Sequence, residues 1–287
     1  MSTALQDRVT GFVAEQVGAV VGCQQLGGGD VAHSYAVDLD DGNRVFAKTH
    51  ANPPPGFFTT EALGLRWLRE PECVNVPAVV AVSDEPAVLV LEWIEVGGSR
   101  SDEAGFGRAL AALHRSGAPS FGREDRRTTG SRRLPNDPCE TWSEFYATQR
   151  LLPLARLAAD AGALPQETCN GLEELAARLD ALGGPPEAPV RLHGDLWAGN
   201  RLVDRTGESW LIDPACHGGH REFDLAMMRL FGGFGPAAFE AYHDAWPLAD
   251  GHEDRVLLHQ LAPLTVHAIK FGGPYVSATD QAVRFYQ

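Results

Sequence analysis

Apolar residues recur along this chain at two different spacings, which predict two structural parts. Near the amino terminus, an amphipathic segment at residues 3–19 predicts a helix. A second helix is expected to end at Arg69, with Thr59 or Thr60 as its cap. Alternating or continuous apolar runs, bounded by turn-forming residues, predict strands at residues 23–26, 31–39, 44–48, 78–82 and 87–92. This part of the sequence therefore predicts a small β-rich lobe.

From about residue 101 onward, apolar residues are mainly three or four positions apart, as they are in helices. This spacing predicts helices at about 101–115, 140–161, 166–181, 221–231, 236–246, 252–270 and 278–286. The pattern changes through a Gly-rich stretch after Trp93, so we place the lobe boundary near Glu95. The expected fold class is α+β, with a small antiparallel β-rich lobe of residues 1–95 and a larger, mainly helical lobe of residues 96–287.

A predicted hairpin at residues 201–212 interrupts the helical lobe, and polar residues stand at both of its ends. His193-Gly194-Asp195 precedes the hairpin, Asn200 comes five positions after Asp195, and Asp213 follows the second strand. Either group alone is typical of an ordinary turn or strand end. Together they match H-R-D-L-x-x-x-N of kinase catalytic loops and the metal-binding Asp that follows it. The combination predicts phosphoryl transfer.

Phosphoryl transfer needs a positioned acceptor hydroxyl and a hard cation against the phosphate oxygens. We therefore expect Asp195 to be the catalytic base that accepts the hydroxyl proton. Asn200 and Asp213 offer oxygen donors that suit Mg²⁺, and they are the predicted metal ligands. His193 is expected to brace the loop by hydrogen bonds. Asp224, at the start of a helix, is expected to accept backbone N–H groups of the loop.

The β-rich lobe carries the residues that are expected to bind ATP. Lys48 ends a predicted strand, as does the kinase lysine that contacts the α and β phosphates, and Glu61 is its expected ion-pair partner. Three consecutive glycines allow backbone N–H groups to approach the phosphates: Gly27, Gly28 and Gly29. Main-chain atoms at the end of a buried strand are expected to bind adenine: Glu92, Trp93 and Ile94.

Composition narrows the partners of the protein. The net charge of −14 over 287 residues argues against a surface that binds nucleic acid or an anionic membrane. Five cysteines are scattered singly, so neither a disulfide framework nor a zinc ribbon is expected. Because no apolar stretch approaches membrane-spanning length, we expect a cytoplasmic protein. Arginines between positions 123 and 133 form either a solvated basic loop or a flap that faces an anion.

The sequence resembles one family over most of its length. Similar segments in the first lobe are residues 27–30, 46–48 and 61–68, and similar segments in the second are residues 193–200, 213–215 and 219–227. These segments resemble the fructosamine kinases, also called ketosamine kinases, in the aminoglycoside and choline kinase-like branch of the protein-kinase-like fold. Within this branch, the discriminating features are Trp197, the stretch G-H-R-E-x-D-L-A-M and residues 229–234.

The resemblance implies an ATP-dependent phosphotransferase that acts on the sugar O3′ hydroxyl of fructosamines or ribulosamines. The acceptor would be a small ketosamine or a glycated lysine of a protein, and decomposition of the product would make the activity a deglycation repair step. Aromatic faces stack on sugars, so Trp197 and Trp246 are the expected substrate residues.

Two alternatives to this function stay open. The first is a phosphotransferase whose acceptor is an aminoglycoside, choline or homoserine. The second is a nucleotide-binding pseudokinase without catalytic activity, which usually lacks one of four residues that this chain retains: Lys48, Asp195, Asn200 and Asp213.

Overall fold

The computed structural model describes residues 2–27, 32–97, 100–128 and 133–287, which form two compact units. The smaller unit comprises the described residues up to Asp102 together with 201–214, and the larger unit comprises the remainder. Bridges from Asn75 to Trp210 and from Val96 to Asp204 join the hairpin to the amino-terminal residues. The hairpin therefore groups with the smaller unit, although the lobes expected from the sequence placed it in the second. The lobe boundary near Glu95 stays a prediction.

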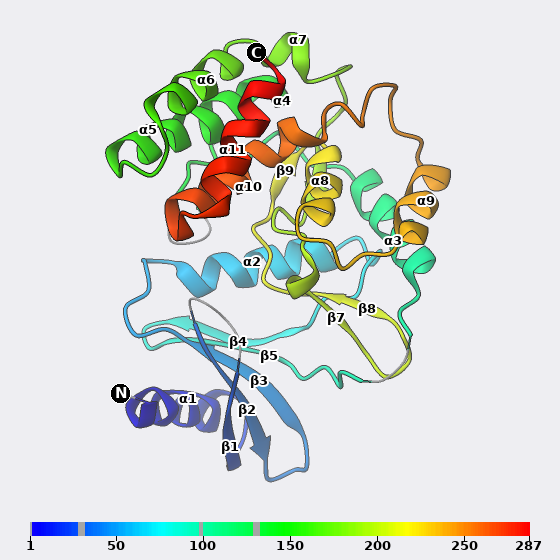
Figure 1. Ribbon diagram of the computed structural model, residues 1–287. Coiled ribbons are helices and arrows are strands. Elements are labelled where there is room, and N and C mark those ends of the chain that lie inside the picture. Colours follow the sequence, from blue (N-terminus) through cyan, green and yellow to red (C-terminus); the bar gives the residue numbers. More distant parts are fainter. Residues whose placement is uncertain (1, 28–31, 98–99, 129–132) are drawn as a thin grey trace. The chain divides into compact units, whose positions relative to one another are not determined.

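An antiparallel sheet of five strands forms the smaller unit, in the order β1-β2-β3-β5-β4 (Figure 1). The strands are β1 (Val20–Leu26), β2 (His33–Leu39), β3 (Arg44–Thr49), β4 (Val79–Asp84) and β5 (Ala87–Glu92). Val88 and Val90 pack in one cluster with Val9 and Val13 of helix α1 (Ser2–Gln16). Because side chains alternate along a strand, Leu89 faces the other side of the sheet, and so does its register partner Lys48.

Helix α2 (Phe57–Arg69) packs against β4 and β5. Its amino-terminal cap is Gly56, which adopts a left-handed φ of 73°. The cap predicted at Thr59 or Thr60 is therefore wrong. Thr59 lies in the first turn of the helix, where its hydroxyl and its backbone N–H both donate to the carboxylate of Asp84. A carboxylate from a neighbouring strand thus takes the role that the sequence assigned to a local threonine.

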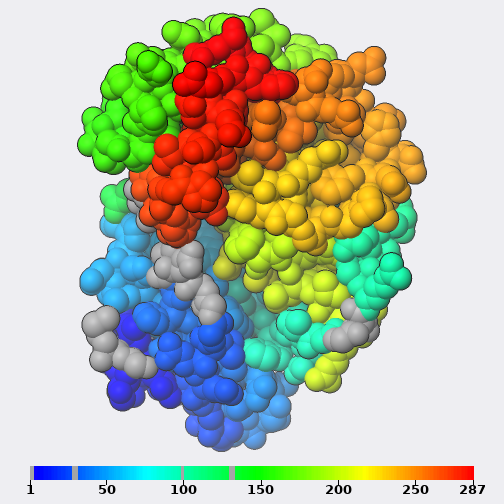
Figure 2. Space-filling model, viewed as in Figure 1, coloured from blue at the N-terminus to red at the C-terminus, as the bar shows by residue number. Residues whose placement is uncertain are grey.

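The larger unit is mainly helical, as the sequence predicted. Its α-helices are α3 (Glu103–Arg115), α4 (Trp142–Tyr146), α5 (Leu152–Asp160), α6 (Gln166–Ala176), α7 (Leu179–Leu182), α8 (Glu222–Leu230), α9 (Pro236–Ala245), α10 (Val256–Phe271) and α11 (Pro274–Phe285). Helix α11, red in Figure 2, forms part of the outer surface. The predicted helix at residues 140–161 is divided by a π-helical turn at Ala147–Leu151.

Short strands place the predicted catalytic segment in the two units. In the larger unit, β6 (Val190–Leu192) pairs antiparallel with β9 (His217–Gly219), and a 3₁₀ turn follows at Ala198–Asn200. In the smaller unit, β7 (Arg201–Val203) and β8 (Ser209–Leu211) form the predicted hairpin. Strands of three residues are too short to show a hydrophobic period, so the pairing of β6 with β9 was not predicted.

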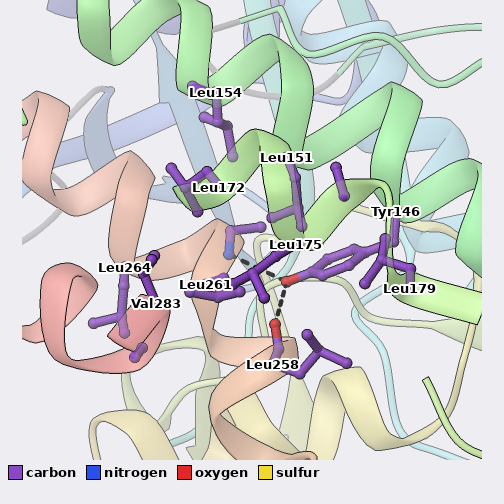
Figure 3. Close-up of a cluster of buried hydrophobic side chains, with 14 of the residues drawn as sticks. Tyr146, Leu151, Leu154, Leu172, Leu175, Leu179, Leu258, Leu261, Leu264 and Val283 are labelled. Atoms are coloured by element: carbon purple, nitrogen blue, oxygen red, sulfur yellow. Dashed lines mark hydrogen bonds between the residues drawn. The ribbon is translucent and has the colours of Figure 1, made fainter. Parts of the chain in front are cut away.

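In the core of the larger unit, the hydroxyl of Tyr146 forms hydrogen bonds with the backbone of α10 (Figure 3). Pro263 lies inside α10 and lacks the N–H that would donate to the carbonyl of His259. The hydroxyl of Tyr146 lies 3.0 Å from that carbonyl oxygen and 2.9 Å from the carbonyl oxygen of Leu258. It also accepts from the backbone N–H of Ala262 at 3.2 Å. One buried hydroxyl therefore fills the gap that the proline leaves in the helix.

In the described part of the chain, no helix has the length and apolar character needed to span a membrane.

We predict that Tyr146→Phe lowers the free energy of unfolding by about 1–3 kcal/mol, because it leaves buried polar groups of α10 without the hydroxyl. The measurement is urea denaturation followed by circular dichroism. In a Pro263→Ala background the loss should be smaller, since residue 263 then donates to His259. An equal loss in both backgrounds would contradict this account.

Candidate active site

Three charged side chains meet in the smaller unit, and each comes from a different element. Lys48 lies on β3, Glu61 on α2, and Asp213 directly after β8. The Nζ atom of Lys48 donates to Oε1 of Glu61 at 2.8 Å and also forms an ion pair with Asp213. The side chains of Lys48 and Glu61 are 8% and 14% exposed, whereas that of Asp213 is 43% exposed. A buried cation is thus held between one enclosed carboxylate and one accessible carboxylate.

Electrostatics fix the charge of this lysine. Burial lowers the pKa of Lys48, but the negative charges of Glu61 and Asp213 outweigh that effect, so its pKa is raised above the ordinary value. The lysine therefore stays protonated across the physiological range. Asp213 adopts a left-handed φ of 53°, which is uncommon for a residue with a side chain. This turn at the end of the hairpin directs its carboxylate towards Lys48.

The remaining predicted nucleotide residues lie around the same sheet. Glu92 ends β5, and its backbone N–H donates to the carbonyl of Ala78 at 2.9 Å. Because that N–H is used inside the sheet, Trp93 and Ile94 are the better candidates for donating a hydrogen bond to adenine. The indole N–H of Trp93 donates to Glu95. Gly27 follows β1 directly, whereas Gly28 and Gly29 lie outside the described residues.

The catalytic loop predicted from the sequence lies in the larger unit, directly after β6. Gly194 has a left-handed φ of 80°, and a Cβ atom there would lie 2.2 Å from the carbonyl oxygen of Ala215. Asp195 is half-buried, and its backbone N–H donates to Nδ1 of His193 at 3.3 Å. The Nδ2 atom of Asn200 donates to the carbonyl oxygen of Asp195 at 2.8 Å and to its carboxylate at 3.0 Å. The loop thus brings the predicted base and one predicted metal ligand into direct contact.

Asp224, on the first turn of α8, accepts hydrogen bonds from the backbone of this loop. Its carboxylate is fully buried and accepts the backbone N–H groups of His193 at 2.8 Å and Gly194 at 2.9 Å. Burial raises the pKa of this carboxyl, but the hydrogen bond and charge of His114 and the loop amide outweigh burial, so the pKa is lowered. Asp224 is therefore ionised and makes charge-assisted hydrogen bonds to the loop.

Two residues that the sequence analysis did not select complete this buried chain. His114 of α3 places Nε2 at 3.3 Å from Asp224 and Nδ1 at 2.8 Å from the hydroxyl of Tyr242 on α9. Burial raises the pKa of Tyr242, so its hydroxyl stays protonated. Helices α3 and α9 approach closely at Gly107, where a Cβ atom would lie 2.1 Å from the carbonyl oxygen of Ala238. The one sequence signal was a histidine on the otherwise apolar face of α3.

The two predicted substrate tryptophans have different surroundings. Trp197 lies in the catalytic loop and is 39% exposed. Trp246 directly follows α9 as its C-cap residue. The guanidinium groups of Arg221 and Arg115 lie over its ring, at 4.0 and 5.5 Å from the ring centroid. This stacking favours a packing role for Trp246 over contact with a sugar. Trp197 remains the better candidate for the substrate.

An ion-pair network anchors the start of α8. Among the described residues, one group of three side chains has the spacing to hold a metal: His220, Glu222 and His259. Both oxygens of Glu222 already accept from Arg255, at 2.9 and 2.7 Å, and Arg221 binds Glu187 at 2.7 Å. Two guanidinium groups beside the histidines oppose a further cation. Burial is the main cause that lowers the pKa of His220 to about 3, and the nearby His259 lowers it further. This pKa favours a neutral ring.

Three arginines of the Arg-rich loop, at positions 123, 126 and 127, lie beside acidic side chains. Arg123 makes two hydrogen bonds to Asp125, each of 2.8 Å, and Arg126 lies 3.2 Å from Asp137. Arg132 lies outside the described residues. These ion pairs favour the solvated-loop interpretation over an anion-facing flap.

Comparisons with known proteins identify the relatives of this chain. A model of the fructosamine kinase family matches residues 6–286. A Synechocystis protein named probable ketoamine kinase is 33% identical over 268 residues, which cover 91% of this chain and 88% of that protein. The chloroplastic protein-ribulosamine 3-kinase of Arabidopsis thaliana is 34% identical over 269 residues, which cover 91% of this chain and 81% of that protein.

Solved structures agree with these relatives. A crystal structure of a candidate fructosamine-3-kinase from Thermobifida fusca matches with a TM-score of 0.89 and 40% identity, covering 97% of this chain and 98% of that chain. A choline kinase from Streptococcus pneumoniae matches with a TM-score of 0.65 and 16% identity, covering 98% of both chains. The second likeness shows the fold alone. The predicted α+β, kinase-like fold is confirmed.

We predict that Asp224→Asn lowers kcat about 100-fold, because the neutral amide weakens two charge-assisted bonds that position the catalytic loop. Steady-state kinetics give kcat, and urea denaturation of the same sample checks that the protein is folded. A folded variant with unchanged kcat would show that the loop keeps its geometry without this carboxylate.

Acid should destabilise the protein before its carboxylates titrate. Burial lowers the pKa of His217 and of His220 from 6.5 to about 3, so the unfolded chain takes up protons below pH 6.5 while the folded chain does not. Each histidine should remove about 1 kcal/mol of unfolding free energy between pH 6.5 and 5.5. The measurement is urea denaturation at both pH values. His220→Asn should show a shallower decline, and an unchanged slope would exclude His220 as a contributor.

Proposed function

This chain belongs to the fructosamine kinase family, and from that premise we propose that it is an ATP-dependent kinase that phosphorylates the sugar O3′ hydroxyl of ketosamines. The observation that carries the proposal is the contact between Asn200 and Asp195. The carboxamide of Asn200 donates to the carboxylate of Asp195 at 3.0 Å, inside a loop anchored on Asp224. The proposed base and one proposed metal ligand thus lie in one short segment, which suits phosphoryl transfer.

We assign the proton transfer to Asp195. As the acceptor oxygen forms its bond to the γ-phosphorus of ATP, the bond from that phosphorus to the bridging oxygen of ADP breaks. The carboxylate of Asp195 takes the proton of the hydroxyl, and ADP leaves with the electron pair. Asn200 holds Asp195 by two hydrogen bonds, one to its backbone carbonyl and one to its carboxylate, so little reorganisation is needed when the acceptor arrives.

The nucleotide phosphates are assigned to Lys48, which Glu61 orients. The cofactor ATP follows from the kinase family, and the proposed metal is Mg²⁺. Its proposed ligands, Asp213 and Asn200, offer hard oxygen donors, and the accessible carboxylate of Asp213 already accepts one cation, the ammonium of Lys48. Bound Mg²⁺ would neutralise charge on the phosphate oxygens.

The proposed acceptors are ketosamines on small amines and on glycated lysines of proteins, and the proposed outcome is deglycation. Relatives named ketoamine kinase and protein-ribulosamine 3-kinase support a ketosamine acceptor. The proposed stacking partner of the sugar is Trp197, which is two positions from the proposed base and 39% exposed. The choline kinase likeness is too distant to favour another acceptor. All four residues that a pseudokinase usually loses in part are present: Lys48, Asp195, Asn200 and Asp213.

We predict that Asp195→Asn lowers kcat for fructosyl-lysine at least about 1,000-fold, because the amide does not accept the hydroxyl proton. A coupled assay of ADP formation gives the rate, and calorimetric titration with ATP and Mg²⁺ should show that binding is retained. Asp160→Asn, at an exposed carboxylate that ends α5, is the matched control and should keep full activity. Unchanged turnover in Asp195→Asn would remove Asp195 from the role of base.

A further inference from the structure

A group of contacting aromatic side chains begins at the catalytic loop and continues to α10 and α11 in the larger unit. Trp197 contacts Phe231 edge to face at a ring-centroid distance of 6.0 Å. Phe231 lies 4.9 Å from His267, and His267 lies 5.6 Å from Phe271. Tyr275 completes the group, at 5.0 Å from His267, 6.1 Å from Phe271 and 6.4 Å from Phe231. We name these five residues the aromatic strip.

The chain is built so that this strip joins the catalytic loop. Phe231 directly follows α8, and two residues later Gly233 adopts a φ of 86°, which turns the chain back onto the loop. A Cβ atom at Gly233 would lie 2.3 Å from the Cβ of Ala198, the residue after Trp197. Phe271 ends α10. Two glycines with positive φ, Gly272 and Gly273, connect it to α11, which carries Tyr275 (Figure 1). The far end of the strip is therefore fixed on two packed helices.

Exposure separates the two ends of this strip from ordinary core packing, whereas Tyr275 also packs against the core of the larger unit. Large aromatic residues of the nearby core, such as Phe145 and Tyr146, are completely buried. Phe271 is 51% exposed and Trp197 is 39% exposed, so both ends of the strip reach solvent. Exposed apolar groups that adjoin a reactive side chain are candidates for a binding surface.

We infer that the aromatic strip binds the polypeptide that carries a glycated lysine, while the catalytic loop holds the sugar. This inference rests on the proposed function and assigns a recognition role to Phe231, Phe271 and Tyr275. Its starting point is Trp197, which is two positions from Asp195. A lysine whose ketosamine lies at Asp195 would place its neighbouring residues beyond Trp197, along the strip.

Phe271 lies within reach of a polypeptide whose glycated lysine is at the catalytic loop. Three ring-to-ring contacts, of 6.0, 4.9 and 5.6 Å, connect Trp197 to Phe271 and set the largest distance between them. An extended chain advances about 3.3–3.6 Å per residue, so a polypeptide that leaves the loop at Trp197 reaches Phe271 within about five residues. Lys270 lies over the ring of Phe271 at 4.6 Å and places a positive charge at this end. The strip therefore suits an extended segment with apolar residues beside the glycated lysine and an acidic residue farther along.

Phe271→Ser tests the inference with two substrates, free fructosyl-lysine and a peptide of about nine residues with the same glycated lysine at its centre. We expect kcat/KM for the peptide to fall about tenfold more than kcat/KM for the free compound, because the free compound has no flanking residues to contact Phe271. Phe271→Trp should restore the peptide rate. Phe285→Ser removes an equally exposed aromatic residue from the end of α11 and should leave both rates unchanged.

The outcomes separate this inference from the proposed function. A folded Phe271→Ser variant that loses activity equally on both substrates, or on neither, would overturn the role of the strip and leave the kinase assignment intact. A wild-type protein that phosphorylates neither substrate would overturn the kinase assignment on ketosamines, and the strip would lose its proposed ligand with it. Thermal unfolding of each variant shows whether a lost rate reflects lost folding.

Discussion

The catalytic loop depends on the buried carboxylate of Asp224. A buried charge is tolerated only when hydrogen bonds replace its lost hydration, and here the donors are the loop amides of His193 and Gly194, with His114 on the other side. The loop cannot leave this position without stranding a charge in the core. The geometry of Asp195 is thus imposed by the energetic cost of an unpaired Asp224, and the loop needs no substrate to adopt it.

The smaller unit uses a different balance of charge. Lys48 is a single cation that faces two acidic side chains. Glu61 is enclosed with the lysine, whereas Asp213 is accessible and joins from the end of a hairpin. This asymmetry supports the proposal that Asp213 exchanges the ammonium for a metal ion. In the proposed reaction, Lys48 would then keep Glu61 and turn its remaining hydrogen-bonding capacity to phosphate.

The sequence predicted the parts of the site that depend on local spacing, and it missed the parts that depend on helix packing. Lys48 with Glu61, and Asp195 with Asn200, were paired from motif intervals, and the structure brings both pairs into contact. His114 and Tyr242 could not be found in this way, because their contact requires α3 and α9 to approach at Gly107. The cap of α2 was misplaced for the same reason, since the acceptor for Thr59 is Asp84, which comes from strand β4.

These two levels of constraint separate chemistry from recognition in the proposed enzyme. Asp195 is tied through Asn200 and the loop amides to a fully buried group, so its position tolerates little change. Trp197 belongs to the same loop but projects into solvent, and Phe271 ends a helix with half of its surface exposed. Substitutions at such positions cost little stability. The carrier of the ketosamine can therefore be selected by the aromatic strip without disturbing the atoms that transfer the phosphoryl group.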